Sequence, residues 1–583
     1  METAKKEFEV EQNGQDAVVD LSYIDSKDGI SFYRLSWNSP TEIIPQKTVV
    51  KWSVPKKDIA FRWYSQKKFN RNLLPDWNSS CAQSRSASGT PIISLINKND
   101  KNSYTIALSD CKTPITLRAG VREKDSRIVC KIELFTQLVS PLKEYETIVR
   151  MDERKIPLEK VLSDVRKWWT ECGYTIASLP RAAKLPMYST WYSMHQDVTD
   201  EKILEQCRIA KKLGMESVII DDGWQTDDNG GNYMYCGDWQ VCEKKIPNFK
   251  KLVEEIHEIG MKVIVWFSVP FVGIKSDAYK RFQGKLLYSE EWTKAYVLDP
   301  RFKDVRKYLV NTYVSFMRLN GIDGFKLDFI DSIELHEYSP KNFQDMDYIS
   351  LEDAVERLLA EISIELRKID SEVMIEFRQR YIGAVMQQYG NMFRVYDCPG
   401  DEVSNKVGTV DLRLMTNGIA VHSDPIMWHY DEDAETAAYQ LNHTLFAVPQ
   451  ISLDLSKLPE QHIKMLKHYL QYQTENREIL LFGEISPRGI AYNYLSVTAR
   501  GDKKDIIALY GESIADIGIH DCDVINATGN EAVYLALNRQ LTADLTVTDC
   551  MGNIVRHDRN FLLKEGLNKI YVPVSGFLLC KIV

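Results

Sequence analysis

Two charged residues that stand two positions apart, Lys326 and Asp328, are the strongest chemical signal in this sequence. They close the apolar run GIDGFKLDFID (321–331), which follows a long amphipathic helical pattern. Alternate side chains of a β-strand point the same way, so the cation would lie beside the carboxylate and favour its ionised form. At the mouth of a barrel, such a carboxylate is suited to act as a nucleophile.

Further polar residues and tryptophans recur at the carboxyl ends of the other predicted strands. Taken singly, each has a structural explanation, because a DDG triplet can be a turn and most tryptophans are largely buried. Core packing does not explain why they recur at one end of successive strands. Carboxylates on facing strands with aromatic walls are what cleavage of a glycosidic bond requires. In strand order the residues are Trp191, Asp221 and Asp222, Trp266, Lys326 and Asp328, Glu376 and Arg378, Arg394 and Asp397, and His422 and Asp424.

The segment that must position these residues, 181–480, alternates strand patterns with helical ones. Eight strand candidates can be counted: PMYSTWYS, ESVIIDDG, KVIVWFSVPF, GFKLDFI, VMIEFR, MFRVYD, AVHSDP and PQISLDL. This alternation predicts a closed parallel (β/α)8 TIM barrel. An open doubly wound sheet is the alternative, but neither GxGxxG nor a phosphate loop follows any of the strands.

The two flanking segments have the pattern of β domains. Short β-type runs separated by polar turns predict an N-terminal β-sandwich over 1–180, which includes the linker helix LEKVLSDVRKWWTECG. Runs such as KDIIALYG and LTVTDC predict a C-terminal antiparallel β-sandwich over 481–583. We therefore expect three domains in the 583 residues.

Composition argues against several classes of function. The net charge of −9 makes nucleic acid an improbable partner. No signal-like or membrane-spanning apolar run is present, and the eleven cysteines form no CxxC pair. Reduced thiols in a cytoplasmic protein are the expectation. The ten histidines form neither HxH nor HExxH, so we expect no metal and no other cofactor.

Four motifs resemble those of the glycoside hydrolase family 36 α-galactosidases, the melibiase-like enzymes related to families 27 and 31. They are STWYS, IIDDGWQ, VIVWFSVPFV and GFKLDFI. The resemblance covers the whole chain in domain order and implies an N-terminal β-supersandwich, a catalytic barrel and a C-terminal β-sandwich. It also implies a retaining exo-acting α-glycosidase, most simply an α-galactosidase, that acts on a glycoside or oligosaccharide without a cofactor. Relatives are often oligomeric, so the resemblance also allows a homo-oligomer.

Carried over position by position, the resemblance makes Asp328 the nucleophile and Lys326 a ligand of a sugar hydroxyl. It makes Asp221 and Asp222 ligands of the 4- and 6-hydroxyls. The general acid/base is expected after an Arg on the sixth strand, within MFRVYDCPGDE. Asp397 and Asp401 both remain candidates there, and Asp397 is preferred because it lies directly at the strand end, three residues after Arg394.

Aromatic residues complete the glycone pocket that the resemblance implies. Trp191 and Trp266 would line it, and Trp77 in LLPDWNSSC would lend an aromatic side chain from the N-terminal domain to its entrance. Sandwich packing is the alternative for Trp77.

The fifth strand departs from the family pattern. Many members carry a Cys- or Gly-rich stretch near the 2-position of the sugar, whereas this chain has IEFRQRYIG, with Glu376, Arg378 and Arg380. Guanidinium groups in a sugar pocket either pair with carboxylates or meet a strongly polar substrate group. Both interpretations of Arg378 remain open: an ion pair with Glu376 or Asp328, or contact with substrate.

The mechanism that the resemblance implies is double displacement by Asp328 with Asp397 as acid and then base. The two carboxyls would need opposite pKa shifts, the nucleophile lowered by its cation and the acid raised by burial or negative neighbours. Three alternatives stay open: an α-N-acetylgalactosaminidase, an α-galactosyl transglycosylase of the raffinose-synthase kind, and a catalytically silent carbohydrate-binding protein. A panel of aryl α-glycosides, product analysis with an added acceptor, and calorimetry would separate them.

Overall fold

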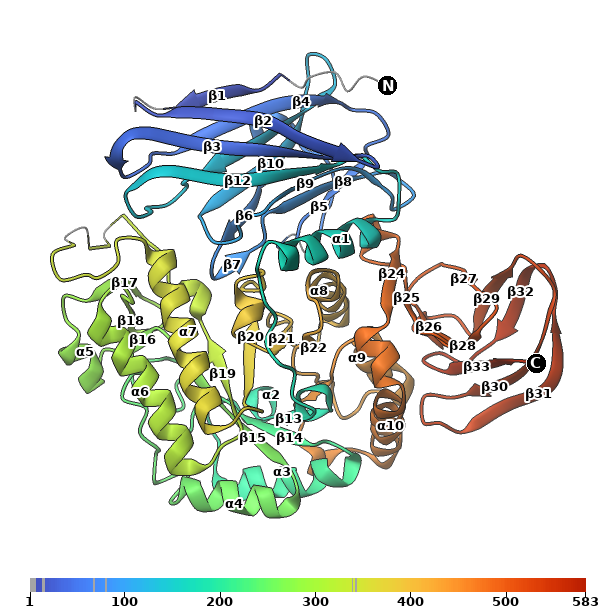
Figure 1. Ribbon diagram of the computed structural model, residues 1–583. Coiled ribbons are helices and arrows are strands. Elements are labelled where there is room, and N and C mark those ends of the chain that lie inside the picture. The colour runs from blue at the N-terminus through green and yellow to red at the C-terminus, as the bar shows by residue number, and fades with distance from the viewer. Residues whose placement is uncertain (1–6, 13–15, 67–68, 79–80, 338, 341–342) are drawn as a thin grey trace.

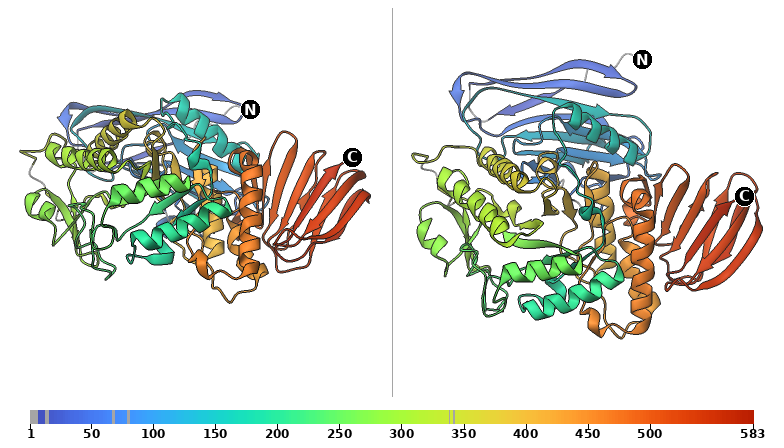
Figure 2. Two further views of the ribbon diagram at one scale, coloured as in Figure 1. Left: turned by 90° about the horizontal axis from the view of Figure 1, so that it is seen from below. Right: turned by 60° about the horizontal axis from the view of Figure 1, so that its bottom comes forward.

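Three domains pack together in the computed structural model, which describes residues 7–12, 16–66, 69–78, 81–337, 339–340 and 343–583. Figure 1 shows the N-terminal β domain above the central barrel and the C-terminal β domain beside the barrel helices α9 and α10. The views in Figure 2 show the same arrangement from two further directions. This architecture confirms the fold class predicted from the sequence.

The N-terminal domain consists of two six-stranded sheets packed face to face. Alternate residues of one strand, such as Val50, Trp52 and Val54, are buried between the sheets, as the two-residue period of a strand requires. The first sheet contains β1 (Glu9–Gln12), β4 (Thr48–Pro55), β11 (Arg127–Leu134), β10 (Ile115–Arg122), β6 (Cys81–Arg85) and β7 (Ser88–Gly89). The second contains β2 (Val18–Lys27), β3 (Ile30–Ile43), β12 (Leu142–Asp152), β9 (Asn102–Leu108), β8 (Ile92–Ile96) and β5 (Phe61–Trp63). Helix α1 (Leu158–Glu171) leads to the barrel.

The barrel is an eight-stranded sheet in which every pairing is parallel. Parallel bridges from His422 to Val448 and from Ile426 to Ile451 bring its two edges together. In chain order the strands are β13 (Met187–Ser189), β14 (Ser217–Ile220), β15 (Lys262–Ser268), β19 (Gly324–Asp328), β20 (Met374–Arg378), β21 (Met392–Arg394), β22 (Ala420–His422) and β23 (Gln450–Ile451). All eight predicted strands are therefore present.

The helices around the barrel begin and end at residues that suit these positions. The Thr199 side chain caps α3 by accepting from the backbone N–H of Lys202, and Gly214 ends that helix with φ +100°, a conformation that favours glycine. The helices are α3 (Asp200–Leu213), α4 (Phe249–Ile259), α6 (Lys303–Asn320), α7 (Leu351–Ile369), α8 (Glu402–Met415), α9 (Ala434–His443) and α10 (Glu460–Phe482).

Two connections depart from simple strand–helix alternation. Between β20 and β21 the described helical structure is one short 3-10 turn, Met386–Gln388, in place of a full helix. After β15 the chain forms a small antiparallel sheet from β16 (Phe271–Gly273), β17 (Leu286–Glu290) and β18 (Ala295–Leu298), with α5 (Asp277–Arg281) inside it.

The C-terminal domain packs a seven-stranded sheet on a three-stranded one. The prediction of a purely antiparallel sandwich is wrong at two places, because β26 pairs in parallel with β28, and β27 with β29. The reason is that the chain between β26 and β28 crosses to the small sheet, where it forms β27, before it returns to the large sheet. The large sheet contains β24 (Glu484–Arg488), β25 (Ser496–Arg500), β26 (Lys504–Leu509), β28 (Asp521–Asn526), β33 (Phe577–Ile582), β30 (Leu541–Thr548) and β31 (Ile554–Leu563). The small one contains β27 (Ala515–Asp516), β29 (Ala532–Leu537) and β32 (Gly566–Tyr571).

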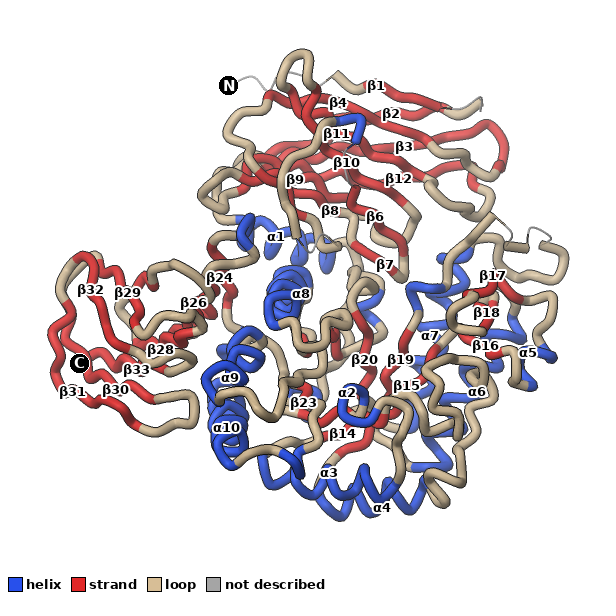
Figure 3. The backbone as a smooth tube through the Cα atoms, turned by 180° about the vertical axis from the view of Figure 1, so that it is seen from behind, coloured by secondary structure: helices blue, strands red, loops and turns tan. Residues whose placement is uncertain are grey.

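One buried carboxylate joins all three domains. Asp411 of α8 accepts hydrogen bonds from Trp63 Nε1 (3.0 Å) and Arg71 Nη2 (3.0 Å) of the N-terminal domain, and from the Tyr494 hydroxyl of the C-terminal domain. All four side chains are buried. Figure 3 shows α8 end-on, between the N-terminal domain and the strands of the C-terminal domain. None of the described helices is long and apolar enough to span a membrane.

Candidate active site

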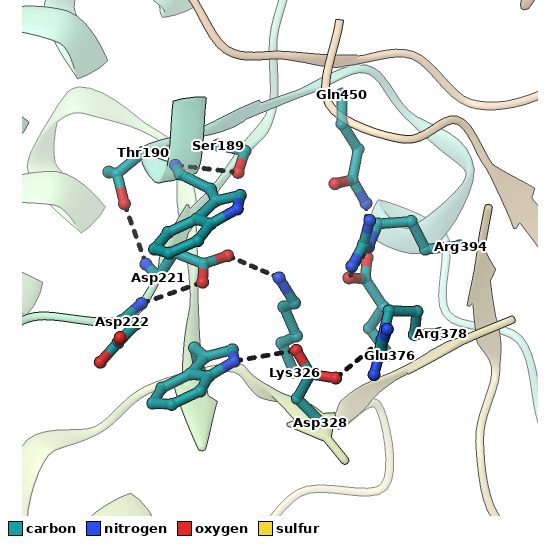
Figure 4. A network of polar contacts seen from close by, with 12 residues as sticks. Ser189, Thr190, Asp221, Asp222, Lys326, Asp328, Glu376, Arg378, Arg394 and Gln450 are labelled. Carbon is teal, nitrogen blue, oxygen red and sulfur yellow. Dashed lines mark hydrogen bonds and ion pairs between the residues drawn. The ribbon is translucent and has the colours of Figure 1, made fainter. Parts of the chain in front are cut away.

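Strand register brings the predicted residues together at the carboxyl end of the barrel. Trp266 of β15 lies beside Lys326 of β19, and Lys326 lies beside Glu376 of β20. One level further along, Arg378 of β20 lies beside Arg394 of β21. The close-up in Figure 4 shows the charged side chains of these strands converging on one centre.

Asp328 lies in the middle of this cluster and is buried. One of its oxygens accepts from Trp266 Nε1 at 3.1 Å, and the other accepts from Arg378 Nε at 2.9 Å. Burial by itself would raise the pKa of Asp328, but the cations Arg378 and Lys326 outweigh it and hold that pKa far below its usual range. The carboxylate is therefore ionised, as a nucleophile must be.

Lys326 has a different partner from the one expected. Its Nζ lies 2.7 Å from the carboxylate of Asp221, and both side chains are buried. The closest cation to Asp328 is instead Arg378 of the neighbouring strand. The backbone N–H of Asp221 donates to Thr190 Oγ1 at 2.9 Å, which fixes the loop after β14 against the loop after β13.

Asp222 lies beside Asp221 but has its own set of partners. Its two oxygens accept from the side-chain amides of Gln196 (2.7 Å) and Gln225 (2.6 Å). Burial raises the pKa of Asp222 to about 6. The sequence analysis missed both glutamines, although Gln225 is the last residue of the motif IIDDGWQ.

The two barrel tryptophans both lie at strand ends in the cluster. Trp266 is buried, and the ring of Tyr233 stacks on it with 6.0 Å between centroids. Trp191 begins the short helix α2 (Trp191–Met194) and is half-buried, with its ring edge-to-face with His195 at 5.0 Å. Tyr233 lies on a long loop without strand or helix periodicity, so no sequence signal marked it.

The structure decides the partner of Arg378. It pairs with Asp328, whereas Glu376 faces Arg394 at 3.6 Å and accepts a hydrogen bond from the Gln450 side chain. Of the two explanations left open by the sequence, the ion pair is present, with Asp328 and not with Glu376 as its partner, and contact of Arg378 with substrate stays a prediction.

The two candidates for the acid/base have different surroundings. Asp397 belongs to the cluster: it lies 2.9 Å from Arg394 Nη1 and 4.0 Å from Arg378 Nη1, and half of its side chain is exposed. Asp401 is the N-cap of α8, where it accepts from the backbone N–H of Ser404 at 2.9 Å. The position of Asp401 is thus explained by helix capping.

The expected rise in the pKa of the acid is wrong for this structure. Burial acts to raise the pKa of Asp397, but Arg394 and Arg378 outweigh it, and the net shift is downward. Both candidate catalytic carboxyls are therefore ionised when no sugar is bound.

A second carboxyl shares Arg394 with Asp397. Asp424 is completely buried, is paired with Arg394, and accepts from the Tyr192 hydroxyl at 2.9 Å and from the Cys398 N–H at 2.8 Å. Burial raises its pKa to about 7. His422, at the end of β22, donates from Nε2 to the Ala183 carbonyl at 2.8 Å, and its Nδ1 lies 3.3 Å from Nε2 of Gln450, the amide that binds Glu376.

Trp77 is separate from the cluster. It lies in a 3-10 turn, Asp76–Asn78, on the N-terminal domain and is 73% exposed. Among the described residues, no hydrogen bond or ring contact joins it to the barrel site. Within that same part of the chain, no group of three or more His, Cys, Asp or Glu side chains could hold a metal ion.

Comparison with known proteins identifies the family of the chain. The family model described as Melibiase matches residues 180–483. α-Galactosidase Mel36A of Lactobacillus acidophilus is 30% identical over 156 residues, 25% of this chain and 21% of that protein. α-Galactosidase AgaA of Geobacillus stearothermophilus is 30% identical over 150 residues, 24% of this chain and 20% of that protein. The sequence matches thus span about a fifth of these relatives.

Solved structures resemble the chain over nearly its whole length. The GH36 α-galactosidase AgaA of G. stearothermophilus superposes with a TM-score of 0.66 at 16% identity, covering 97% of this chain and 81% of that one. The α-galactosidase of Lactobacillus brevis gives 0.65 at 14%, covering 99% and 85%. At these identities the likeness shows a shared fold.

Proposed function

Since the chain belongs to the melibiase family, we propose that it is a retaining exo-acting α-galactosidase, which hydrolyses terminal α-galactosyl residues by double displacement. One observation carries this proposal: a single guanidinium, that of Arg378, contacts both Asp328 and Asp397. The two carboxyls therefore lie on either side of one guanidinium, which supports a common site for a nucleophile and an acid/base.

The floor of the site supports attack on a terminal sugar. Asp221, Lys326 and Glu376 are all buried; Lys326 pairs with Asp221, and one Glu376 oxygen accepts from the Gln450 side chain. This buried layer supports the binding of a chain end. Similar proteins are named α-galactosidases, and the AgaA enzyme has been solved with raffinose, whose class of oligosaccharide is the substrate we propose.

The first step is attack by an Asp328 oxygen on the anomeric carbon. The C–O bond to the leaving group breaks, a β-linked glycosyl enzyme forms, and Asp397 gives its proton to the departing oxygen. In the second step Asp397 takes a proton from water, the water oxygen attacks the anomeric carbon, and Asp328 is released. The α configuration is retained because each step inverts it once.

Arg394 and, to a smaller extent, Arg378 hold Asp397 as its anion, so substrate binding must change the protonation of this acid. In the free enzyme Arg378 lies near Asp397 and favours its anion. A sugar bound between the two carboxyls displaces water and separates this guanidinium from Asp397, which raises the pKa of the acid for the first step. Glycosyl-enzyme hydrolysis then requires the anionic form, which Arg394 favours.

The test removes the nucleophile and replaces it chemically. Asp328→Gly should abolish turnover of an aryl α-galactoside, and azide should restore it with β-galactosyl azide as the product. Recovery of that inverted product identifies the lost group as the nucleophile. Undiminished hydrolysis by Asp328→Gly without azide would disprove the assignment.

A further inference from the structure

A cavity of about 470 Å³ lies where the three domains meet, between helix α1, the end of helix α8 and strand β24. These three elements contact one another, and Figure 1 shows α1 beside α8 and β24. The wall also includes residues 416–419, which immediately precede strand β22. The cavity is therefore at the amino end of the barrel strands, opposite the carboxyl end that holds the candidate active site.

Two arginines that have no carboxylate partner among the described residues line this cavity. Arg166 of α1 donates from Nη1 to the carbonyls of Arg413 (3.2 Å) and Leu414 at the end of α8. Arg413 itself donates to carbonyls that include those of Phe446 (3.1 Å) and Gly483 (2.9 Å). Carbonyls carry only partial charges, so they orient both guanidiniums and leave two full positive charges without a counterpart.

The acidic side chains of the wall do not balance these charges, because each is already paired with another cation. The pairs are Glu159 with Arg488 (3.2 Å), Asp164 with Arg154 (2.8 Å) and Glu484 with Lys160. Lys167, which is exposed on α1, also belongs to the wall and has no carboxylate partner in the described part of the chain. The wall therefore carries three uncompensated cations, Arg166, Lys167 and Arg413.

Donors remain in the wall for a ligand that accepts hydrogen bonds. Nε of Arg166 is enclosed and Nη1 is engaged with α8, but Nη2 is not enclosed and has no partner among the described residues. The side chains of Ser163 and Asn417 in the same wall are half-buried and can donate as well. Guanidinium, ammonium, hydroxyl and amide donors together suit an oxyanion.

The proximity of the two arginines has a cost that an anion would remove. Burial lowers the pKa of Arg166 to about 10 and that of Arg413 to about 9, and the charge of Arg166 adds to the second shift. Both side chains are still cations at neutral pH, so each disfavours the other. A negative charge between them would favour both.

We propose that this cavity binds a phosphate group, as inorganic phosphate or as part of a small phosphorylated metabolite. Arg166 and Lys167 contact its oxygens, and Arg413 adds a third positive charge. The volume is within the range of pockets that hold small molecules. Since the ligand contacts α1 and the segments next to α8 and β24, it stabilises the junction of the three domains and takes no part in the reaction.

The experiment is calorimetry on the full chain with inorganic phosphate and with glucose 6-phosphate, with chloride at equal ionic strength as the blank. Arg166→Gln and Lys167→Gln each remove one cation of the wall. Arg367→Gln, on α7, is the matched control for the first, because it is another half-buried arginine without a carboxylate partner among the described residues. Lys467→Gln, on the exposed face of α10 and outside the wall, is the control for the second.

The wild type should bind phosphate, and phosphate should raise its melting temperature relative to chloride. Arg166→Gln should weaken phosphate binding about tenfold to a hundredfold, the effect of a lost hydrogen bond to a charged group. Lys167→Gln should weaken it about twofold to fivefold, because an exposed charge is screened. Lys167 has no ion pair to lose in the described part of the chain, so this variant should fold as the wild type does and keeps the test decisive if Arg166→Gln is destabilised.

The two phosphate probes identify the source of the phosphate group. Equal affinities indicate the free ion, and tighter binding of glucose 6-phosphate indicates a phosphorylated metabolite; either result supports the site if Arg166→Gln and Lys167→Gln weaken it and the controls do not. No binding to the wild type, or equal binding by the wild type and both cavity variants, would overturn the inference. Binding that is lost in Arg378→Met and kept in Arg166→Gln would place the ion in the catalytic cluster, which also overturns it.

Discussion

Arg378 donates from Nε to the carboxylate of Asp328 across 2.9 Å, so the proposed nucleophile is held by a cation from the neighbouring strand before any sugar arrives. The contact keeps the carboxylate ionised and fixes its orientation. It also places a guanidinium in the space between the two proposed catalytic carboxyls, where the reacting sugar must bind.

Replacing Arg378 by Met should shift the acid limb of the pH profile for kcat/KM upward. In the wild type the pKa of Asp328 is well below its usual range, so the nucleophile stays ionised in moderate acid. Without the guanidinium, burial is opposed mainly by Lys326 and Arg394, and the pKa of Asp328 should rise. Arg357→Met, on the exposed face of α7, is the control. An unchanged acid limb would show that Arg378 does not tune the nucleophile.

Asp397 and Asp401 should respond differently to the same substitution. Asp397→Asn removes the proposed acid/base and should lower kcat/KM for raffinose by about 10²–10⁴-fold, with a smaller loss for an aryl substrate whose leaving group needs less protonation. Asp401→Asn retains a good N-cap side chain, so it should hardly change kcat/KM or stability.

Asp401→Ala completes that comparison. It should cost about 1 kcal/mol of stability and leave kcat in place, because it removes a helix cap. The reverse pattern, with Asp401 variants inactive and Asp397→Asn active, would move the acid/base to Asp401. Thermal unfolding and steady-state kinetics measure both effects.

Lys326→Met should destabilise the protein by about 3–5 kcal/mol, because it leaves the buried carboxylate of Asp221 without its cation. Adding Asp221→Asn should recover much of this stability but no activity. Lys250→Met removes an exposed pair with Glu254 and should cost no more than about 0.5 kcal/mol. Denaturant unfolding measures these differences, and a Lys326→Met protein as stable as the Lys250→Met control would contradict the prediction.

Asp424 should make stability fall as pH rises. Its pKa is about 7 in the folded protein and about 3.9 in an unfolded chain, so the folded state binds this proton more tightly. Ionisation then costs folding free energy progressively between about pH 4 and pH 7 and adds no further cost above that. Asp424→Asn cannot titrate, so its stability relative to the wild type should increase over this window and level off.

Denaturant unfolding at several pH values tests that slope, with the exposed Asp431→Asn as the control for loss of one surface carboxylate. A constant difference between Asp424→Asn and the wild type from pH 4 to pH 7 would show that Asp424 does not titrate there.

The sequence predicted the positions of the site residues better than their partners. The two-residue period of each strand placed Lys326 and Asp328 on one face, and the alternation of strands and helices placed them at one end of a barrel. Their ion pairs depend on which side chain of the next strand reaches them. Glu376 and Arg378 both face the site from β20, and only the register of β19 with β20 decides which of them meets Asp328.

Features set by long-range packing could not be predicted. The separation of Asp397 from Asp401 depends on where α8 begins, because Asp401 is engaged as its cap. Gln196 and Tyr233 come from loops whose local sequence has no periodicity, yet they contact Asp222 and Trp266 in the folded chain. A hydrogen bond between the N-terminal domain and the barrel, from the Gly89 N–H to the Arg380 carbonyl, joins residues nearly 300 positions apart.

The buried Asp411 makes the stability of each domain depend on the other two. Its donors Trp63 and Arg71 belong to the N-terminal domain, and Tyr494 belongs to the C-terminal domain. Removing either flanking domain therefore leaves the Asp411 carboxylate of α8 without some of its hydrogen-bond donors. A barrel expressed without its flanking domains would therefore keep a buried carboxylate that has lost its hydrogen-bond donors, and changes at the surface would not replace them. A chimera in which one flanking domain comes from a homologue must keep all four of these residues compatible. We therefore expect related sequences either to contain all four residues or to replace them together.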